Sequence, residues 1–529
     1  MSIFDLEQDE LKIAALNRGM NRMAYEQQAP TRDITNGAFG NGAINFRWEC
    51  SGTKWWVPSR SYLRMRVELS KTGGPGVAFA SLLQGDNVAP AMNLMSTLFQ
   101  SMEFRINDKL ISRVSELVPQ VDTLEKRLSK SKSWLDGVGK STNFWESDVK
   151  IRKLDSTSDG KSVSPALERT DVANLVGGDV TAVAATGVVT FANAQTNNPW
   201  LAGDEFEITV AGLVTRAPVL SVAANNLSLR IGALTLAADV AAQQAYSRYR
   251  NNYTNEARNL NTFEITWTPC LSVYKLNHAL PTGRYELVLV PNPNYKTYAI
   301  ESTGSATKAN ADYYFNIKDF YHYVNTVEGA RFDNGTYYLD LQQTSCTTRQ
   351  VGTSNSLKQE QFDVSPSTYA LTVAFGDTRV GTDTRVSASK FRAYDDNLVS
   401  QEGKLTRFML QYAGQSLPNP DADTDYRTGV DLFTQRYNDS ILYSGGYFET
   451  GGAETIEEWR ERGQYLYFAV PRDGTDRSTR VTVNFAMGNA TTPATDLKNT
   501  NLLLFAHSKQ VAMVKVQDGR VTDCQLEDA

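Results

Sequence analysis

The sequence of 529 residues contains little histidine and little cysteine. No two of its three histidines are close in the sequence, which argues against a histidine-based metal site or catalytic triad. The three are His278, His322 and His507. The cysteines are far apart and form no CxxC pair, so neither a zinc knuckle nor a disulfide framework is indicated. These are Cys50, Cys270, Cys346 and Cys524.

The sequence also lacks an excess of basic charge, a long apolar run and a secretory leader. Its formal net charge is −6, which argues against a protein whose main task is to neutralise phosphates. No apolar run is long enough to span a bilayer, and the N-terminus is not of the charged-then-apolar secretory kind. We therefore expect synthesis and folding in a cytosol or a nucleus.

What the sequence does contain is alternation of apolar and polar residues with a period of two. The clearest runs are residues 44–50, 63–69, 263–267 and 481–485. Each run predicts a strand with one face for a core, and Gly, Asn, Asp and Ser are common between the runs. Many short strands predict β-sandwiches or barrels rather than a parallel α/β sheet. The length is enough for two to four domains of roughly 100–200 residues each.

Three segments have the apolar spacing of an amphipathic helix. They are residues 5–23, 115–134 and 429–443. The first carries Leu6, Ile13, Leu16 and Met20 as its apolar stripe.

A strand, a tight turn, a short strand and then a helix occur twice. In the first copy, residues 102–106 precede the turn Asn107-Asp108 and a short apolar segment. In the second copy, residues 407–412 precede Ala413-Gly414 and residues 415–417. We expect Phe104 and Ile106 to face a core, with Arg105 turned away.

Two further pairs of segments match in the same order along the chain. "GRYELVLVP" at residues 283–291 resembles "GQYLYFAVP" at residues 463–471. "FNIKDFYHYVNTVEG" at residues 315–329 has the same length as "FAHSKQVAMVKVQDG" at residues 505–519. Three ordered matches predict an internal duplication with a period of about 180 residues.

The duplication is unequal, because residues 178–243 form a block with few charges and much Ala, Val, Thr, Asn and Gly. This block predicts a small inserted β domain at an exposed end of its host. The expected domains are an N-terminal helical arm at 1–40, a first unit at 41–330 with this insertion, and a second unit with the C-terminal tail at 331–529.

Two tandem units of this kind resemble the double jelly-roll major capsid proteins of icosahedral DNA viruses. The particular likeness is "LFQSMEFRINDKLIS" at residues 98–112, which is similar to a phrase in such proteins of virophages and polinton-like viruses. It departs from that phrase at Asp108-Lys109, where a Gly is expected. The run "NTNLLLFAHSKQVAMVKVQDGRV" resembles the closing strands of a second jelly roll. The likeness extends from about residue 43 to 521, without the insertion.

This resemblance implies an all-β fold of two tandem jelly-roll sandwiches and a structural function. Three chains would form a homotrimer with six jelly rolls, a capsomer of pseudo-hexagonal outline that tiles an icosahedral shell. Two similar domains in each of three chains supply six similar edges. The implied partners are other copies of the chain, minor capsid or penton proteins and an internal membrane, with no sequence-specific nucleic acid. The implied location is the virion.

Three other kinds of site, for phosphate, for calcium and for glycoside hydrolysis, are incompletely supported by the sequence. "WLDGVGKST" at residues 134–142 contains Gly-Lys-Ser-Thr but lacks the first Gly of a phosphate-binding loop and the strand before it. Acidic clusters at Asp395-Asp396 and at Asp421, Asp423 and Asp425 lack the Gly and Glu of an EF-hand. A glycoside hydrolase needs two carboxylates whose separation the sequence does not give. We therefore expect no catalytic, cofactor-binding or metal-binding residue, no cofactor, and no enzyme activity.

Two function classes remain from the sequence, a self-assembling shell protein and a β-sandwich spike that binds a receptor or carbohydrate. The duplication favours the shell. Residues 1–33 carry four basic and six acidic side chains, which is unlike an arm that packages nucleic acid. We expect this N-terminal segment to be a contact arm on the inner side of a shell.

Overall fold

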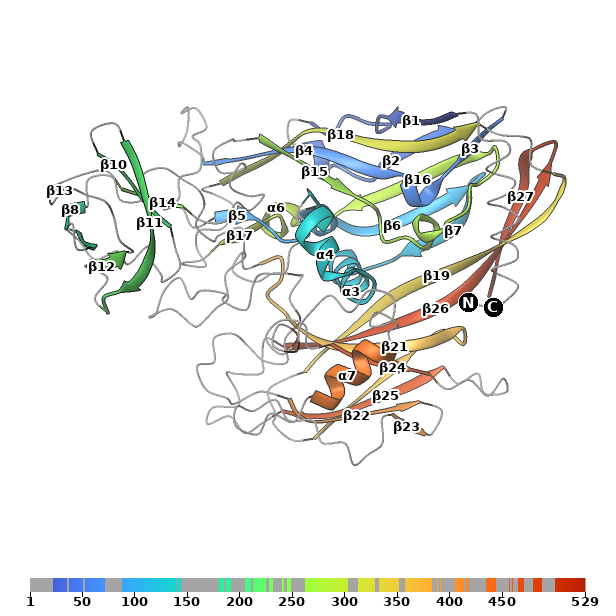
Figure 1. The fold of residues 1–529 in the computed structure, drawn as a ribbon. Coiled ribbons are helices and arrows are strands. Elements are labelled where there is room, and N and C mark those ends of the chain that lie inside the picture. The colour runs from blue at the N-terminus through green and yellow to red at the C-terminus, as the bar shows by residue number, and fades with distance from the viewer. Residues whose placement is uncertain are drawn as a thin grey trace.

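The structure, a computed structural model, is dominated by antiparallel sheets (Figure 1). It describes residues 22–35, 38–50, 53–71, 88–139, 141–142, 144, 180–184, 187–191, 205–210, 213–224, 228–231, 240–241, 245–248, 262–302, 313–328, 333–351, 357–382, 388, 391, 405–412, 415–417, 434–443, 456, 459, 465–470, 479–487 and 500–528.

The first half of the chain forms a sandwich of two sheets. One sheet has the order β1-β18-β4-β15, and the facing sheet has the order β2-β16-β6-β7. The strands are β1 (Arg22–Gln28), β2 (Ile44–Glu49), β4 (Tyr62–Lys71), β6 (Phe99–Ile106), β7 (Lys109–Val114), β15 (Thr262–Trp267), β16 (Arg284–Pro291) and β18 (Tyr313–Glu328). The short strand β3 (Lys54–Trp56) also pairs with β18.

The second half forms a sandwich with sheets β19-β26-β21-β24 and β20-β25-β22-β23. Its strands are β19 (Gly335–Gln350), β20 (Lys358–Asp363), β21 (Thr368–Asp377), β22 (Leu405–Tyr412), β23 (Gln415–Leu417), β24 (Tyr465–Ala469), β25 (Arg480–Met487) and β26 (Thr500–Gln517). A last strand, β27 (Arg520–Asp528), pairs with the far half of β26. In Figure 1 the first sandwich lies above the second, and β19 and β26 run between them.

The two sandwiches have the same topology. When the eight paired strands of each sandwich are counted in chain order, one sheet reads 1-8-3-6 and the other 2-7-4-5 in both halves. A jelly roll consists of two antiparallel sheets with eight strands in total, between which the chain passes in this order. The expected fold class, two tandem jelly-roll sandwiches with few helices, is thus observed.

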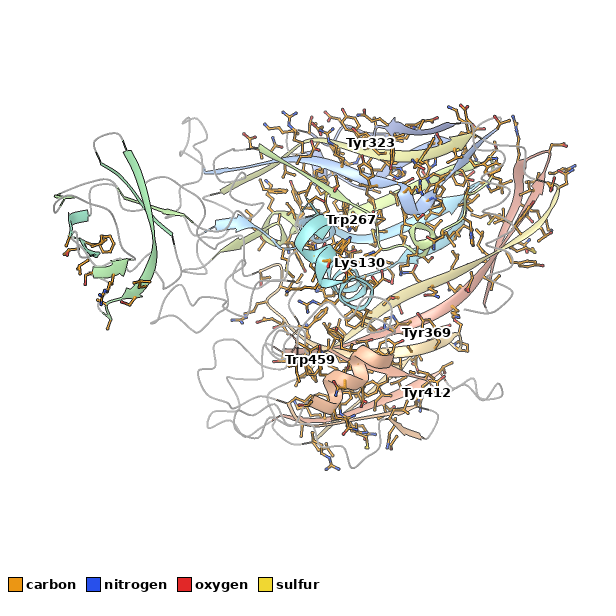
Figure 2. The ribbon with its side chains drawn as sticks, viewed as in Figure 1. Lys130, Trp267, Tyr323, Tyr369, Tyr412 and Trp459 are labelled. Atoms are coloured by element: carbon orange, nitrogen blue, oxygen red, sulfur yellow. The ribbon has the colours of Figure 1, made fainter. Side chains whose placement is uncertain are left out.

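Apolar side chains on the inner faces fill each sandwich (Figure 2). On β4 the buried residues Leu63, Met65 and Val67 alternate with more exposed neighbours, as the period of two predicts. Phe104 and Ile106 on β6 are buried and Arg105 between them is partly exposed, which confirms their expected faces. Burying such side chains stabilises a fold by roughly 1.5–3 kcal/mol each.

Helices are short and lie at loops between strands. The segment expected to be helical at 115–134 contains α3 (Val118–Ser129) and α4 (Lys132–Trp134), followed by η4 (Leu135–Gly139), and the segment at 429–443 contains α7 (Thr434–Tyr443). Both α3 and α7 follow strand five of their sandwich, which agrees with the repeated strand–turn–strand–helix motif. The remaining short elements are η1 (Ala38–Gly40), η2 (Pro58–Arg60), β5 (Val88–Pro90), α2 (Leu94–Thr97), η6 (Ser272–Lys275), α6 (Tyr295–Tyr298) and β17 (Ile300–Ser302).

The expected insertion contains a separate sheet of order β13-β8-β9-β12-β11-β10-β14, drawn apart from the sandwiches in Figure 1. Its strands are β8 (Val180–Val183), β9 (Val188–Phe191), β10 (Glu205–Val210), β11 (Leu213–Val222), β12 (Ser228–Ile231), β13 (Val240–Ala241) and β14 (Ala245–Arg248). Because β14 pairs with β10, the sheet extends past the expected end at residue 243.

The expected N-terminal helical arm at 1–40 needs correction where the structure describes it. Residues 22–28 form β1, which pairs with β18 along its whole length and so belongs to the first sandwich. The run "RMAYEQQ" lacks the strict apolar alternation of the other strands, so its conformation depends on the free edge of β18. Residues 1–21, with the apolar stripe from Leu6 to Met20, lie outside the described residues.

One of the three matches behind the duplication joins strands that are not equivalent. Residues 284–291 form β16, the seventh strand of the first sandwich, whereas residues 465–469 form β24, the sixth strand of the second. The equivalent of β24 is β15. The other two matches are consistent with the topology, because β6-β7 and β22-β23 are strands four and five, and β18 and β26 are both strand eight.

Candidate functional site: the joint between the two sandwiches

Helix α3 lies at the side of the first sandwich that faces the second, and much of its surface is buried. It begins after Leu117, which has a left-handed backbone with φ of 56°, and Pro119 lies in its first turn. Lys126 Nζ donates to Asp122 Oδ2 at 2.7 Å and to Asn93 Oδ1 at 2.6 Å. Trp267 Nε1 donates to the same Asp122 oxygen at 3.2 Å. This buried ion pair therefore has additional partners, which a buried charge needs.

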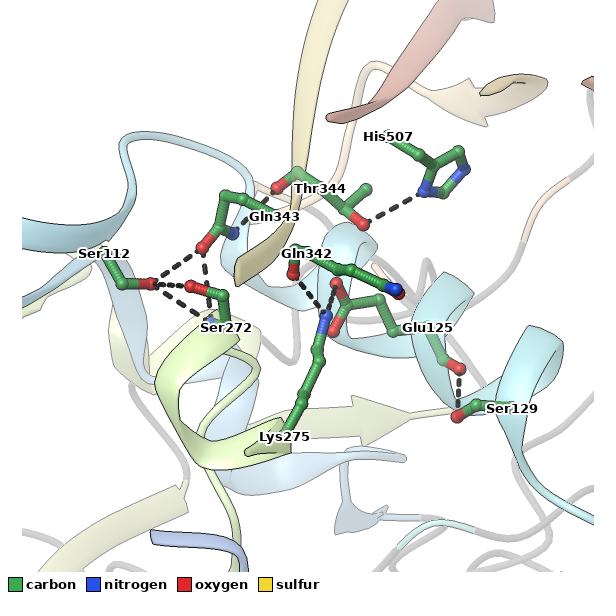
Figure 3. A network of polar contacts seen from close by, with 9 residues as sticks. All are labelled: Ser112, Glu125, Ser129, Ser272, Lys275, Gln342, Gln343, Thr344 and His507. Carbon is green, nitrogen blue, oxygen red and sulfur yellow. Dashed lines mark hydrogen bonds and ion pairs between the residues drawn. The ribbon is translucent and has the colours of Figure 1, made fainter. Parts of the chain in front are cut away.

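A polar network joins β7 and η6 of the first sandwich to β19 of the second (Figure 3). Ser112 Oγ donates to Gln343 Oε1 at 2.8 Å, and Ser272 Oγ donates to Ser112 Oγ at 2.8 Å. The backbone N–H of Ser272 points at both acceptors, at 3.1 Å from Ser112 Oγ and 3.3 Å from Gln343 Oε1. All three residues are buried, so these hydrogen bonds replace water that the groups have lost.

An ion pair of the first sandwich lies at the same boundary, and its lysine bonds across it. Lys275 Nζ on η6 donates to Glu125 Oε1 on α3 at 2.6 Å and to the Gln342 carbonyl oxygen on β19 at 3.3 Å. Burial raises the pKa of Glu125, although the Lys275 ammonium and the Thr344 hydroxyl both favour its charged form. The Glu125–Lys275 pair thus lies close to the second sandwich and in contact with it.

The C-terminal hairpin forms a second contact between the halves. Val521 N–H on β27 donates to the Thr282 carbonyl oxygen at 2.8 Å, and Asn107 Nδ2 donates to the Val521 carbonyl oxygen at 2.8 Å. Asn107 and Asp108, in the turn between β6 and β7, both have positive φ, at 47° and 66°. Such a pair is typical of a type I′ hairpin turn, and Asn and Asp tolerate it without a Gly. Two of the contacts between the sandwiches are together called the joint: the network around Ser112, Ser272 and Gln343 with the Glu125–Lys275 pair, and the β27 contact.

The outward face of the sheet β2-β16-β6-β7 carries a chain of opposite charges. Arg47 and Glu286 are cross-strand partners with Nε and Oε1 2.6 Å apart, and Arg105 lies 3.8 Å from Glu286 on its other side. The Glu103 carboxylate lies 2.7 Å from Arg105 and 3.4 Å from Arg113. Opposite charges that face each other across strands stabilise the pairing of those strands and keep the outward face polar.

The equivalent face of the second sandwich, on β20-β25-β22-β23, is uncharged at the centre of its middle strands, with Arg480 and Arg407 farther along β25 and β22. Asn484 on β25 pairs in register with Gln359 on β20 and with Met409 on β22. Thr482, two residues earlier on the same face, pairs with Gln361 and Gln411. The two halves therefore share a strand order and differ in surface chemistry.

The Gly-Lys-Ser-Thr segment lies in a helical part of the chain. The segment 134–142 runs through α4 and η4, and the Gly139 carbonyl oxygen accepts from Thr142 N–H at 3.1 Å and Phe144 N–H at 2.8 Å. Helices α3 and α4 precede it, where a phosphate-binding loop needs a strand. Asp395-Asp396 and the cluster at Asp421, Asp423 and Asp425 lie outside the described residues.

Two of the histidines are buried in different places, His322 inside the first sandwich and His507 on the face of the β26 sheet that is turned toward the joint. Over the part of the chain that the structure describes, no group of three or more His, Cys, Asp or Glu side chains is arranged to hold a metal ion. In the same part, no helix has the length and apolar character needed to cross a membrane. The sequence does not predict the joint residues, because isolated Ser, Gln and Thr residues carry no pattern.

Comparison with known proteins supports the fold. No protein-family model and no curated protein matches the chain. A cryo-EM structure of the Sputnik virophage is similar, with a TM-score of 0.51, 10% identity, and coverage of 96% of this chain and 89% of that one. The mavirus major capsid protein gives a TM-score of 0.44 at 11% identity, covering 95% of this chain and 90% of that one.

The first of these likenesses extends over nearly the whole chain. At 10% identity it shows a shared fold. The resemblance predicted from residues 98–112 is thus confirmed at the level of the fold.

Proposed function

We propose that this chain is a major capsid protein that self-assembles as pseudo-hexagonal trimers and tiles an icosahedral virus shell. The observation that supports this most is the repeated strand order, since each chain presents two similar blocks in one unit. A hexagonal tile needs six similar edges, and three chains with two blocks each provide them. The joint matters for this role because blocks that pivoted freely would not keep the outline of a tile.

The proposed role is structural rather than catalytic, and the proposed location is the shell of the virion. Its partners would be two further copies in the trimer, neighbouring capsomers, and minor capsid or penton proteins. An internal membrane is a further proposed neighbour, and no sequence-specific nucleic acid is expected. As domains we propose a first sandwich that ends near residue 330, an insertion between strands five and six, and a second sandwich at 331–529. Residues 1–21 remain as a proposed contact arm.

The alternative function is a β-sandwich spike that binds a receptor or a carbohydrate. The aromatic residues Tyr25, Tyr62 and Tyr323 on the outer face of β1, β4 and β18 are the feature that favours it. Tyr62 and Tyr323 stack with ring centroids 5.2 Å apart, and Tyr25 meets Tyr62 edge-on at 5.7 Å. Stacked aromatic rings suit sugar faces, but they are equally suited to contacts between subunits.

The experiment that separates the two functions is the mass and shape of the purified protein. Light scattering should give about three times 58.6 kDa, roughly 176 kDa, over the micromolar range. Negative-stain images should show flat particles of hexagonal outline. A protein that stays monomeric throughout this range would contradict the capsid proposal. Binding of glycans by such a monomer, lost when Tyr62 and Tyr323 are changed to Ala, would support the spike instead.

A further inference from the structure

Two of the three histidines are buried, each on the eighth strand of its sandwich. His322 lies inside the first sandwich, whereas His507 lies on the face of its sheet that is turned toward the joint. His322 on β18 is 0% exposed and His507 on β26 is 4% exposed. Their hydrogen-bond partners are hydroxyl groups, which accept a hydrogen bond from a neutral ring without supplying the negative charge that an imidazolium needs.

His322 is enclosed by aromatic rings from β2 and η6. Its ring centroid lies 4.6 Å from that of Trp48 and 6.0 Å from that of Phe46. Tyr274 Oη lies 3.1 Å from His322 Nε2, and His322 Nδ1 has no partner among the described residues. Tyr274 is the titratable group that faces it, and burial holds the pKa of that phenol well above its usual range. Burial lowers the pKa of His322 to about 3.

His507 is held between β19 and β21. Thr344 Oγ1 lies 3.0 Å from its Nδ1, and Thr372 Oγ1 lies 2.8 Å from its Nε2. Tyr369 and Tyr467 pack against the ring, with centroids 6.2 Å and 5.7 Å away.

The charged groups near His507 come from the joint and from its own strand. They are Lys275 on η6, Glu125 on α3, which bonds to Thr344, and Lys509, which lies over the Tyr369 ring. Burial lowers the pKa of His507 to about 3, and the nearby Lys275 ammonium contributes in the same direction.

We propose that His322 and His507 form a paired acid-sensitive device, in which protonation of one buried ring in each sandwich loosens both halves of the chain together. The proposal rests on the eighth-strand position of both rings, on their burial and on their hydroxyl-only partners. It goes beyond the proposed function and needs no shell. In a shell built from this chain, it would make mildly acidic surroundings a trigger for opening.

The direction of the pH response follows from linkage. An unfolded histidine accepts a proton near its usual pKa of about 6.5, whereas the folded ring resists it down to about 3. Stability from each ring is therefore complete above about pH 6.5 and is lost as the pH falls toward 3. For each histidine the unfolding equilibrium constant should rise about tenfold per pH unit in this window, and about a hundredfold for the two together.

Glu125 opposes the acid-induced loss of stability that is assigned to His507. Its raised pKa means that the folded state accepts a proton more readily than the unfolded chain does, so acid relieves part of its burial cost. His507 should therefore show a weaker net response than His322 at the acid end. A Glu125→Gln variant removes this opposing contribution and should steepen the acid response assigned to His507.

The test is urea unfolding of the full chain at a fixed protein concentration between pH 7.5 and 5.5, where carboxylates with an ordinary pKa scarcely titrate. The variants are His322→Gln, His507→Gln and the double change, since an amide can still bond to the neighbouring hydroxyls. His278→Gln is the matched control, because His278 is partly exposed. Each variant is compared with its own stability at pH 7.5, so a general loss of stability does not enter the result.

The wild type and the His278 control should lose stability as the pH falls. Each single variant should lose about half as much, and the stability of the double variant should be nearly independent of pH. If the sandwiches unfold in separate steps, each change should flatten only the step of its own sandwich. If His322→Gln does not fold, His322→Phe takes its place. The pH dependence of wild-type stability then serves as a second measurement. A wild type that is independent of pH in this range, or a double variant with the wild-type slope, would overturn the proposal.

Discussion

Strands β4 and β21 hold the third place in their sandwiches, yet their surroundings differ. On β4, Leu63, Met65 and Val67 are buried, while Arg64 and Arg66 between them keep 27% and 53% of their side chains exposed. On β21, every residue from Ala370 to Phe375 is buried. The sheet of β4 has one face toward a core and one toward solvent, whereas the sheet of β21 is covered on both faces. The shared strand order thus leaves the environment of a strand open, and what packs on its outer face decides it.

The comparison extends to the side-chain interiors. Phe104 on β6 and Phe408 on β22 are both on the fourth strand and both buried. Phe104 lies among several aromatic rings, with Trp56 at 5.2 Å, Trp48 at 6.1 Å and Tyr285 at 6.2 Å between centroids. Phe408 stacks on Phe468 at 5.7 Å. The first sandwich therefore has an aromatic cluster at a position where the second has a stacked pair.

The largest effect is expected for Phe104→Ala, at roughly 3–5 kcal/mol of unfolding free energy, because the change leaves a cavity among rings that cannot collapse. Phe408→Ala should be at the lower end of that range, and Arg105→Ala, next to Phe104, should be close to neutral. Chemical unfolding of the three variants measures this. A neutral effect at Phe104 would mean that the described burial of β6 is wrong.

The next effect tests the joint. Gln343→Ala removes the acceptor shared by Ser112 and Ser272, and leaving these buried groups without it should cost about 1–3 kcal/mol. Gln342→Ala is the matched control, because Lys275 uses only the backbone oxygen of that residue. We expect the control to stay within about 0.5 kcal/mol of the wild type. Equal losses in the two variants would show that the network does not hold the sandwiches together.

A smaller effect tests the contrast between the matched charges on one outer face and the uncharged centre of the other. Glu286→Gln removes the carboxylate between Arg47 and Arg105 and should cost on the order of 1 kcal/mol in dilute buffer, because both arginines are partly exposed. In about 1 M salt the difference should shrink, since screening acts within a few ångströms. Gln359→Ala, next to the uncharged centre of the other face, should show no such salt dependence. The same loss at both salt concentrations would assign the effect to packing.

The smallest effect is expected outside the sandwiches. Replacing residues 178–248 by a short Gly/Ser linker should leave the mass of the assembled protein unchanged apart from the deleted part. Within the described part of the chain, the seven strands of this sheet pair with one another and not with a sandwich. Light scattering measures the result. Loss of soluble oligomer would show that the insertion contributes to the core or to assembly.

Strand alternation, the two hairpins and the insertion could be predicted from the sequence because they depend on neighbours in the chain. A period of two reports which face is buried, as it does at Phe104 and Ile106. The position of helix α7 could be predicted for the same local reason.

The equivalence of strands, the role of residues 22–28 and the joint were decided by tertiary structure. The phrase shared by residues 283–291 and 463–471 is one that many buried strands satisfy, and only pairing partners show that β16 and β24 differ in place. Residues 22–28 form a strand because β18 offers an edge, which no local pattern encodes. Ser112, Ser272 and Gln343 are distant in sequence, and their hydrogen bonds exist because folding removes water from all three at once.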